Sequence, residues 1–214
     1  MANADHQSQD PHLHRLTILC DGVFAIALTL LSLELKPPEG WDGQNLMGII
    51  APKLVAYAVS FAVIGIYWAT HRRCFQNLAR ADLLLDVFSL VFLALLALLP
   101  PTTAVLYQHA TIETVITYIG LVTAIGWAQA LTWGYACFVG KLVKPEVPMA
   151  TRVFVLFTNA VLPGGMCGLS FYSLATGSPW GWVGIAVLGT IAGFGHKWLA
   201  RLTGRRGPQA GKFA

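Results

Sequence analysis

Long apolar segments, separated by short stretches rich in polar residues, proline and glycine, dominate the hydrophobicity pattern of the chain. The first segment, residues 16–35, would form a helix about 30 Å long, which matches the hydrocarbon thickness of a bilayer. Further apolar segments of spanning length follow at residues 46–73, 83–99, 110–139, 153–174 and 180–202. The pattern therefore predicts an all-α, polytopic membrane protein whose subunit has six transmembrane helices.

Prolines set two features of this prediction. The third segment is expected to end before Pro100-Pro101, because proline lacks the N–H that a helix interior needs. The fifth segment contains Pro163-Gly164-Gly165, which is expected to kink the helix, the commoner outcome, or to open a backbone site.

Composition and charge agree with a membrane protein and give it an orientation. The 214 residues are 56% hydrophobic and only 11% charged, which excludes an ordinary soluble domain. With the amino terminus inside, Lys36 and Lys53 are the only basic residues that fall outside. Both termini are therefore expected on the cytoplasmic side of the membrane, which is expected to be a bacterial-type plasma membrane. The same rule accounts for the formal charge of +4 without a nucleic-acid partner. Residues 1–14 and 204–214 are expected to be cytoplasmic tails, the first flexible and the second basic, flanking a transmembrane domain at 15–203.

The first apolar segment has two different faces. At 100° per residue, a narrow stripe contains Gly22, Ile26, Thr29 and Leu33, with Leu30 at its edge. Asp21 points away from this stripe. Small and branched residues also mediate ordinary packing between membrane helices, and periodicity alone favours that explanation over a pore lining.

Several polar residues are expected at one depth in the membrane. In the predicted topology Asp21, Trp68, His71 and Asp86 all lie a turn or two inside the cytoplasmic face. A carboxylate, an imidazole and an indole N–H can satisfy one another, as a low dielectric requires. A simple salt bridge between Arg15 and Asp21 is not expected, because they lie about 120° apart on the helical projection.

Enzymatic chemistry is not expected from these residues. The sequence has no Gly-x-Ser-x-Gly nucleophile motif, no His/Glu pair at metal-ligand spacing and no Cys-x-x-Cys pair among its four cysteines. No metal or cofactor is therefore expected.

A family resemblance rests mainly on the first span and on residues 68–73. The residues that carry it in the first span are Arg15, Leu19-Cys20-Asp21-Gly22-Val23-Phe24-Ala25-Ile26-Ala27, Thr29-Leu30-Leu31 and Leu33-Glu34. This stretch resembles the first-helix signature of the transmembrane protein 175 family of potassium channels, and is most similar to the short bacterial members. The centre of the family motif reads Phe-Ser-Asp, whereas this chain has Leu19-Cys20-Asp21.

The resemblance implies a homotetramer around a central pore lined by the first helix. It implies an apolar constriction at Ile26, Leu30 and Leu33, with hydroxyls added by Thr29. It also implies a structural polar network that braces this helix. Its members would be Arg15, Asp21, Trp68 and His71, with Asp86 at a position usually held by asparagine.

The function implied is that of a potassium-selective or potassium-preferring cation channel. Its partners would be further copies of the chain, the lipid bilayer and monovalent cations, with potassium as the permeant ion. The sequence has no Thr-Val-Gly-Tyr-Gly filter, so rings of backbone carbonyls are not the expected source of selectivity. The alternatives are a proton-coupled secondary transporter with a relay through Asp21, His71 and Asp86, a proton-permeable leak channel, and a non-conducting scaffold. No paired inverted repeats support the transporter.

Overall fold

The described part of the chain is helical throughout its regular elements. A computed structural model describes residues 10–33, 35–36, 43–44, 46–109 and 111–177. The elements are α1 (Pro11–Leu33), α2 (Leu46–Gln76), α3 (Leu83–Ala97), α4 (Leu99–Gln108), α5 (Ile112–Gly134), the π-helical turn η1 (Tyr135–Val139) and α6 (Met149–Thr176). They fall into two compact units, one up to Lys144 and one from Pro145 onward. The predicted all-α class is confirmed.

Five of the predicted spans lie within the described residues. Helical segments long and apolar enough to cross a membrane are Pro11–Leu33, Lys53–Gln76, Leu83–Gln108, Ile112–Val139 and Met149–Ser173. The sixth predicted span, residues 180–202, and the tail at 204–214 lie outside the described residues.

The first helix begins earlier than the sequence pattern indicates. Asp10 precedes it, and its two carboxylate oxygens accept hydrogen bonds from the backbone N–H groups of His12, at 3.0 Å, and Ala81, at 2.9 Å. Pro11 fits the first helical position, where no N–H is required. These bonds, that from Ala81 first, lower the pKa of the Asp10 carboxyl from its usual value because they stabilise the charged form. His12 and His14 consequently lie in the first turn of α1 and not in a tail.

The prediction that the third span stops at Pro100-Pro101 is wrong. The chain leaves α3 at Ala97 and starts α4 at Leu99, so both prolines fall in the first turn of a new helix. Proline is tolerated there because the first N–H groups of a helix have no partner within it. The two helices form one membrane-length segment. In contrast to these two prolines, Pro163 lies in the interior of its helix, α6, which is one helix from Met149 to Thr176.

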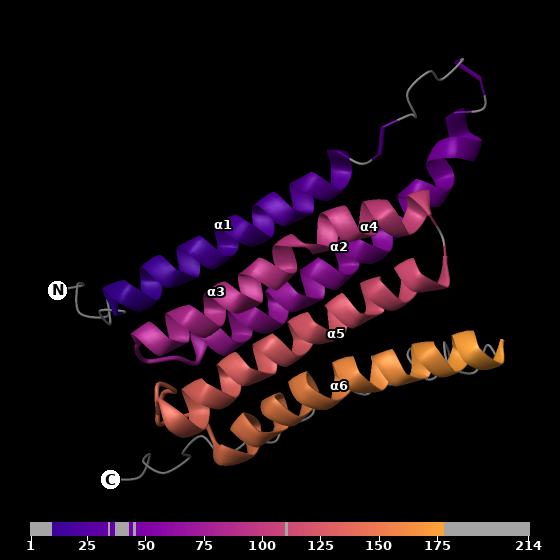
Figure 1. The fold of residues 1–214 in the computed structure, drawn as a ribbon. Coiled ribbons are helices and arrows are strands. Elements are labelled where there is room, and N and C mark those ends of the chain that lie inside the picture. The colour runs from indigo at the N-terminus through magenta and orange to yellow at the C-terminus, as the bar shows by residue number, and fades with distance from the viewer. Residues whose placement is uncertain (1–9, 34, 37–42, 45, 110, 178–214) are drawn as a thin grey trace, which may run out of the picture. The chain divides into compact units, whose positions relative to one another are not determined.

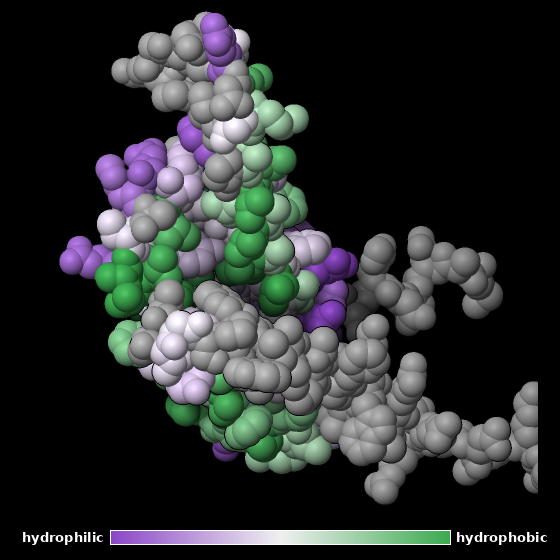
Figure 2. Space-filling view, turned by 90° about the vertical axis from the view of Figure 1, so that its right-hand side faces the viewer, coloured by the Kyte–Doolittle hydropathy of each residue, from purple (hydrophilic) through white to green (hydrophobic). Residues whose placement is uncertain are grey.

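Helices α1 to α5 pack into one bundle in the first unit. In Figure 1, α1 lies along the pair formed by α2 and the α3–α4 segment, and it contacts α2, α3 and α4. Helix α5 packs against α3 and α4 and makes a smaller contact with α2. The largest fully buried side chains come from each of these helices: Phe24, Leu31, Ile64, Phe92, Leu99 and Trp133. Many other large apolar side chains lie on the outside, and apolar residues are prominent on the surface in Figure 2.

The loops at one end of this bundle are fastened to each other. The connection between α2 and α3 pairs with the segment after η1, through the bonds Ala79 N to Leu142 O at 2.8 Å and Lys144 N to Asn77 O at 2.9 Å. Ala81 in the same connection binds Asp10 before α1. The start of α1, the end of α2 and the start of α3 are thereby held at one end of the bundle.

Candidate functional site

Helix α1 has one face buried in its own subunit and one face exposed. The buried side chains repeat at helical spacing: Leu13, Leu16, Cys20, Phe24, Ala27 and Leu31. On the opposite side Ile26 is 59% exposed, Leu33 53% and Leu30 40%, and Thr29 is exposed with them. The predicted stripe therefore lies on the side of α1 that faces away from α2 to α5.

The exposed face of α1 is apolar and carries few hydrogen-bonding groups. Gly22 at its start has no neighbouring atoms within 4 Å of the place where a Cβ would stand. The Thr29 hydroxyl donates to the Ile26 carbonyl at 2.8 Å, so its hydrogen is used within the helix. Its oxygen keeps acceptor capacity toward water or a cation. Such a face can meet lipid, further copies of the chain, or a dehydrated passage.

Asp21 is bound to helix α2. The indole N–H of Trp68 donates to Asp21 Oδ1 at 2.9 Å, and both side chains are exposed. The Arg72 guanidinium lies 5.5 Å from the centre of the Trp68 ring, a cation–π distance. The Asp21 carboxylate therefore joins α1 to α2. This contact agrees with the prediction that Asp21 and Trp68 lie at the same depth in the membrane.

Asp86 forms a second junction, between α3 and the start of α1. Its Oδ2 atom lies 2.8 Å from His12 Nε2, and the contact is an ion pair when the imidazole is protonated. Its Oδ1 atom is buried and has no hydrogen-bond partner among the described residues. His12 was expected in the amino-terminal tail, so the pattern along the chain did not predict it as a partner of Asp86. The signal was available, because His12 and Asp86 lie near the starts of two helices that begin at the same face.

His71 lies apart from both carboxylates, in an aromatic cluster. The imidazole is 4% exposed and stacks on Phe92 with ring centres 5.1 Å apart and an interplanar angle of 5°. Phe75 and Phe24 complete the cluster, at 4.1 and 5.8 Å from the imidazole centre. Since Phe24 comes from the buried face of α1, this cluster joins α1, α2 and α3.

The five residues of the expected network thus do not form one connected network. Asp21 and Trp68 are paired with each other, Asp86 pairs with His12, and His71 packs among phenylalanines. Arg15 is exposed and forms no hydrogen bond or ion pair with any described residue. All of these contacts hold α1 in place, but no chain of hydrogen bonds among the described residues connects Asp21, His71 and Asp86.

Comparison with known proteins identifies similar channels. Residues 15–100 match the family model described as endosomal/lysosomal potassium channel TMEM175. A protein of Streptomyces collinus named as a potassium channel is 35% identical over 171 residues, which cover 74% of this chain and 82% of that protein. The rat protein named as an endosomal/lysosomal proton channel, TMEM175, is 26% identical over 145 residues, 65% of this chain and 29% of the rat protein. The crystal structure of a lysosomal potassium-selective channel TMEM175 homolog from Chamaesiphon minutus matches with a TM-score of 0.65 and 27% identity, covering 85% of this chain and 95% of that one.

Proposed function

Because the chain belongs to the TMEM175 family of ion channels, we propose that it is a potassium-selective or potassium-preferring cation channel whose pore is lined by α1. The observation that carries this proposal is the exposed apolar face of α1, on which Ile26, Leu30 and Leu33 lie together. The family and the similar proteins are ion channels and not enzymes.

The pore would form between copies of the chain. One subunit presents a single pore-like stripe and cannot surround a passage, whereas a homotetramer can bring four such stripes to a common axis. In that assembly Ile26, Leu30 and Leu33 form an apolar constriction, and the Thr29 oxygen adds an acceptor among them. An ion passing rings of aliphatic side chains loses hydration, so this constriction is the main barrier to conduction.

The polar contacts of α1 would fix the orientation of this pore face. Trp68 holds Asp21 from α2, and Asp86 holds His12 from α3. His12 lies in the first turn of α1 and Asp21 near its middle. The end of the bundle where α1 starts also holds the basic residues Arg72 and Lys144. Since basic residues favour the cytoplasmic side, we propose that this end faces the cytoplasm. We further propose a bacterial-type plasma membrane as its location, with residues 15–203 as the transmembrane domain.

Electrical recording of the purified, reconstituted protein tests this function. In planar bilayers we expect unitary current steps, a reversal potential in potassium/sodium gradients that favours potassium, and a particle with the mass of a tetramer. Bilayers fused with protein-free vesicles from the same detergent serve as the control. A stable monomer or dimer without unitary steps would overturn the proposal.

Proton permeation is the second candidate, because several relatives are named as proton channels. Vesicles that contain the reconstituted protein, loaded with a pH-sensitive dye and subjected to a pH gradient, distinguish the two functions. Potassium current without dye response supports the potassium channel, and dye response without potassium current supports a proton leak. Slow, coupled movement of both ions without unitary steps would instead support the proton-coupled transporter with a relay through Asp21, His71 and Asp86.

A further inference from the structure

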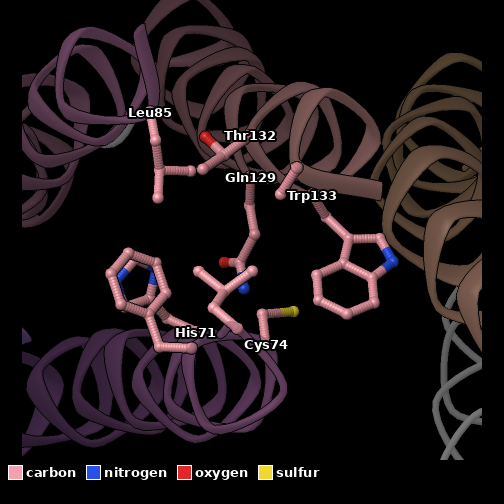
Figure 3. A pocket seen from close by; sticks show the side chains of 9 residues that line it. His71, Cys74, Leu85, Gln129, Thr132 and Trp133 are labelled. Carbon is pink, nitrogen blue, oxygen red and sulfur yellow. The ribbon is translucent and has the colours of Figure 1, made fainter. Parts of the chain in front are cut away.

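A small cavity lies between α2, α3 and α5, beside the aromatic cluster. Figure 3 shows His71 and Cys74 on one side of it, with Leu85, Gln129 and Thr132 on the other. Ala136 adds to the wall from η1, the π-helical turn that follows α5. The cavity has room for about one water molecule.

Two buried polar side chains reach this cavity without hydrogen-bond partners. His71 Nε2 and both terminal atoms of Gln129 are buried, and none has a partner among the described residues. The two residues are only 4% and 3% exposed, so neither lipid headgroups nor bulk water can serve them. Thr132 differs, because its hydroxyl donates to the Ala128 carbonyl at 2.9 Å within α5. Buried polar groups in folded proteins are almost always paired with protein or with ordered water.

We propose that the cavity is a binding site for one ordered water molecule that bridges His71 on α2 and Gln129 on α5. The water donates a hydrogen to His71 Nε2 or accepts one from it, according to the tautomer of the imidazole. It meets either the Gln129 carbonyl oxygen or its NH2 group, according to how the amide is turned. A water in such a position typically makes about three hydrogen bonds. The size of the cavity excludes occupants larger than a water molecule. A bare cation is excluded because the site offers it only two ligands, one imidazole nitrogen and one amide oxygen.

The bridge links two helices that otherwise share few contacts. Helices α2 and α5 touch each other less than either touches its main neighbours. A water between them would fasten α5 to the same helix whose Trp68 holds Asp21. This inference does not depend on which ion the protein conducts.

A cryo-electron microscopy map of the intact protein in lipid nanodiscs, at a resolution that shows ordered water, tests the site directly. We expect a density peak within hydrogen-bond distance of both His71 Nε2 and the Gln129 amide. A map that shows other waters but leaves this cavity empty, with the two side chains bonded directly to each other, would overturn the proposal.

Thermal stability gives a second, independent readout. His71→Phe keeps the stacking on Phe92 and Gln129→Leu keeps the volume of the amide, but each removes one end of the bridge. Each single variant is expected to lower the melting temperature by roughly 2 to 4 °C. The double variant should lower the melting temperature by less than the sum of the two single variants, because no unpaired polar group remains in the cavity. Thr132→Val is the control, because Thr132 lines the same cavity but its hydroxyl is already paired. This variant should change the melting temperature little. Strictly additive losses in the double variant would contradict the bridge.

Discussion

The contact between Trp68 and Asp21 gives the sharpest prediction about how the pore helix is held. Trp68→Phe removes the indole N–H that Asp21 accepts at 2.9 Å, but keeps an aromatic ring beside Arg72. A hydrogen bond to a charged group contributes about 1.5 to 3 kcal/mol. Since Trp68 is 37% exposed and Asp21 is also exposed, water competes for the bond. We therefore expect a loss near the lower limit, about 1.5 kcal/mol per subunit.

Substitutions at Asp21 separate the hydrogen bond from the charge. Asp21→Ala removes both, whereas Asp21→Asn keeps a carbonyl acceptor for the indole and removes only the charge. The assay is the temperature at which the assembly dissociates in mild detergent, with reversal potentials measured in parallel. Trp68→Phe and Asp21→Ala should lower this temperature by similar amounts, Asp21→Asn by less, and the double variant Trp68→Phe/Asp21→Ala by little more than either single one.

Two results would refute this reasoning. If the losses of the double variant are additive, Trp68 and Asp21 do not act through one bond. If Asp21→Asn changes potassium/sodium selectivity while Trp68→Phe leaves it unchanged, the carboxylate acts on the permeating ion, and its role in bracing α1 is misassigned.

Two further predictions concern stability. The lowered pKa of Asp10 means that its contribution is present above the usual carboxyl pKa of about 4 and is lost as the pH falls through the lowered folded-state value. Asp10→Ala should therefore lower the melting temperature at neutral pH and make it depend less on pH in the acid range. A melting temperature that falls equally with acid in both proteins would contradict the role of Asp10 in binding the His12 and Ala81 N–H groups. Ser60→Ala should cost about 1 to 3 kcal/mol because Ser60 is buried and lies 2.9 Å from both the Thr103 and the Tyr118 hydroxyls, joining α2, α4 and α5. Thr102→Ala is the control, because, among the described residues, the half-buried Thr102 hydroxyl bonds only to the Leu98 carbonyl one turn earlier. Equal losses in the two variants would count against the contacts of Ser60 with Thr103 and Tyr118.

Periodicity predicted the two faces of α1 because the helix packs on one side only. Residues at 100° steps then separate cleanly into the buried Cys20, Phe24 and Ala27 and the exposed Ile26 and Leu33. The Asp21–Trp68 contact followed from depth in the membrane, since a carboxylate and an indole donor at the same level of adjacent helices satisfy each other.

Tertiary contacts decided what the sequence pattern could not. The start of α1 depends on Asp10 binding Ala81, which lies 71 residues away. Pro100-Pro101 is compatible with both the end of one helix and the first turn of the next, and packing of α4 against α5 selects the second. Gln129 could have been noticed, because an uncharged amide inside an apolar span needs a partner.

The central claim, that the exposed face of α1 lines the ion pathway, is tested most directly at Ile26. Four asparagines at this ring would replace aliphatic groups with amides that can solvate a cation, so Ile26→Asn should raise unitary conductance or open probability and weaken potassium/sodium selectivity. Val91→Asn on α3, an apolar position of similar exposure at 51%, is the matched control and should leave permeation unchanged. If Val91→Asn alters the currents in bi-ionic recordings and Ile26→Asn does not, α1 is not the pore-lining helix.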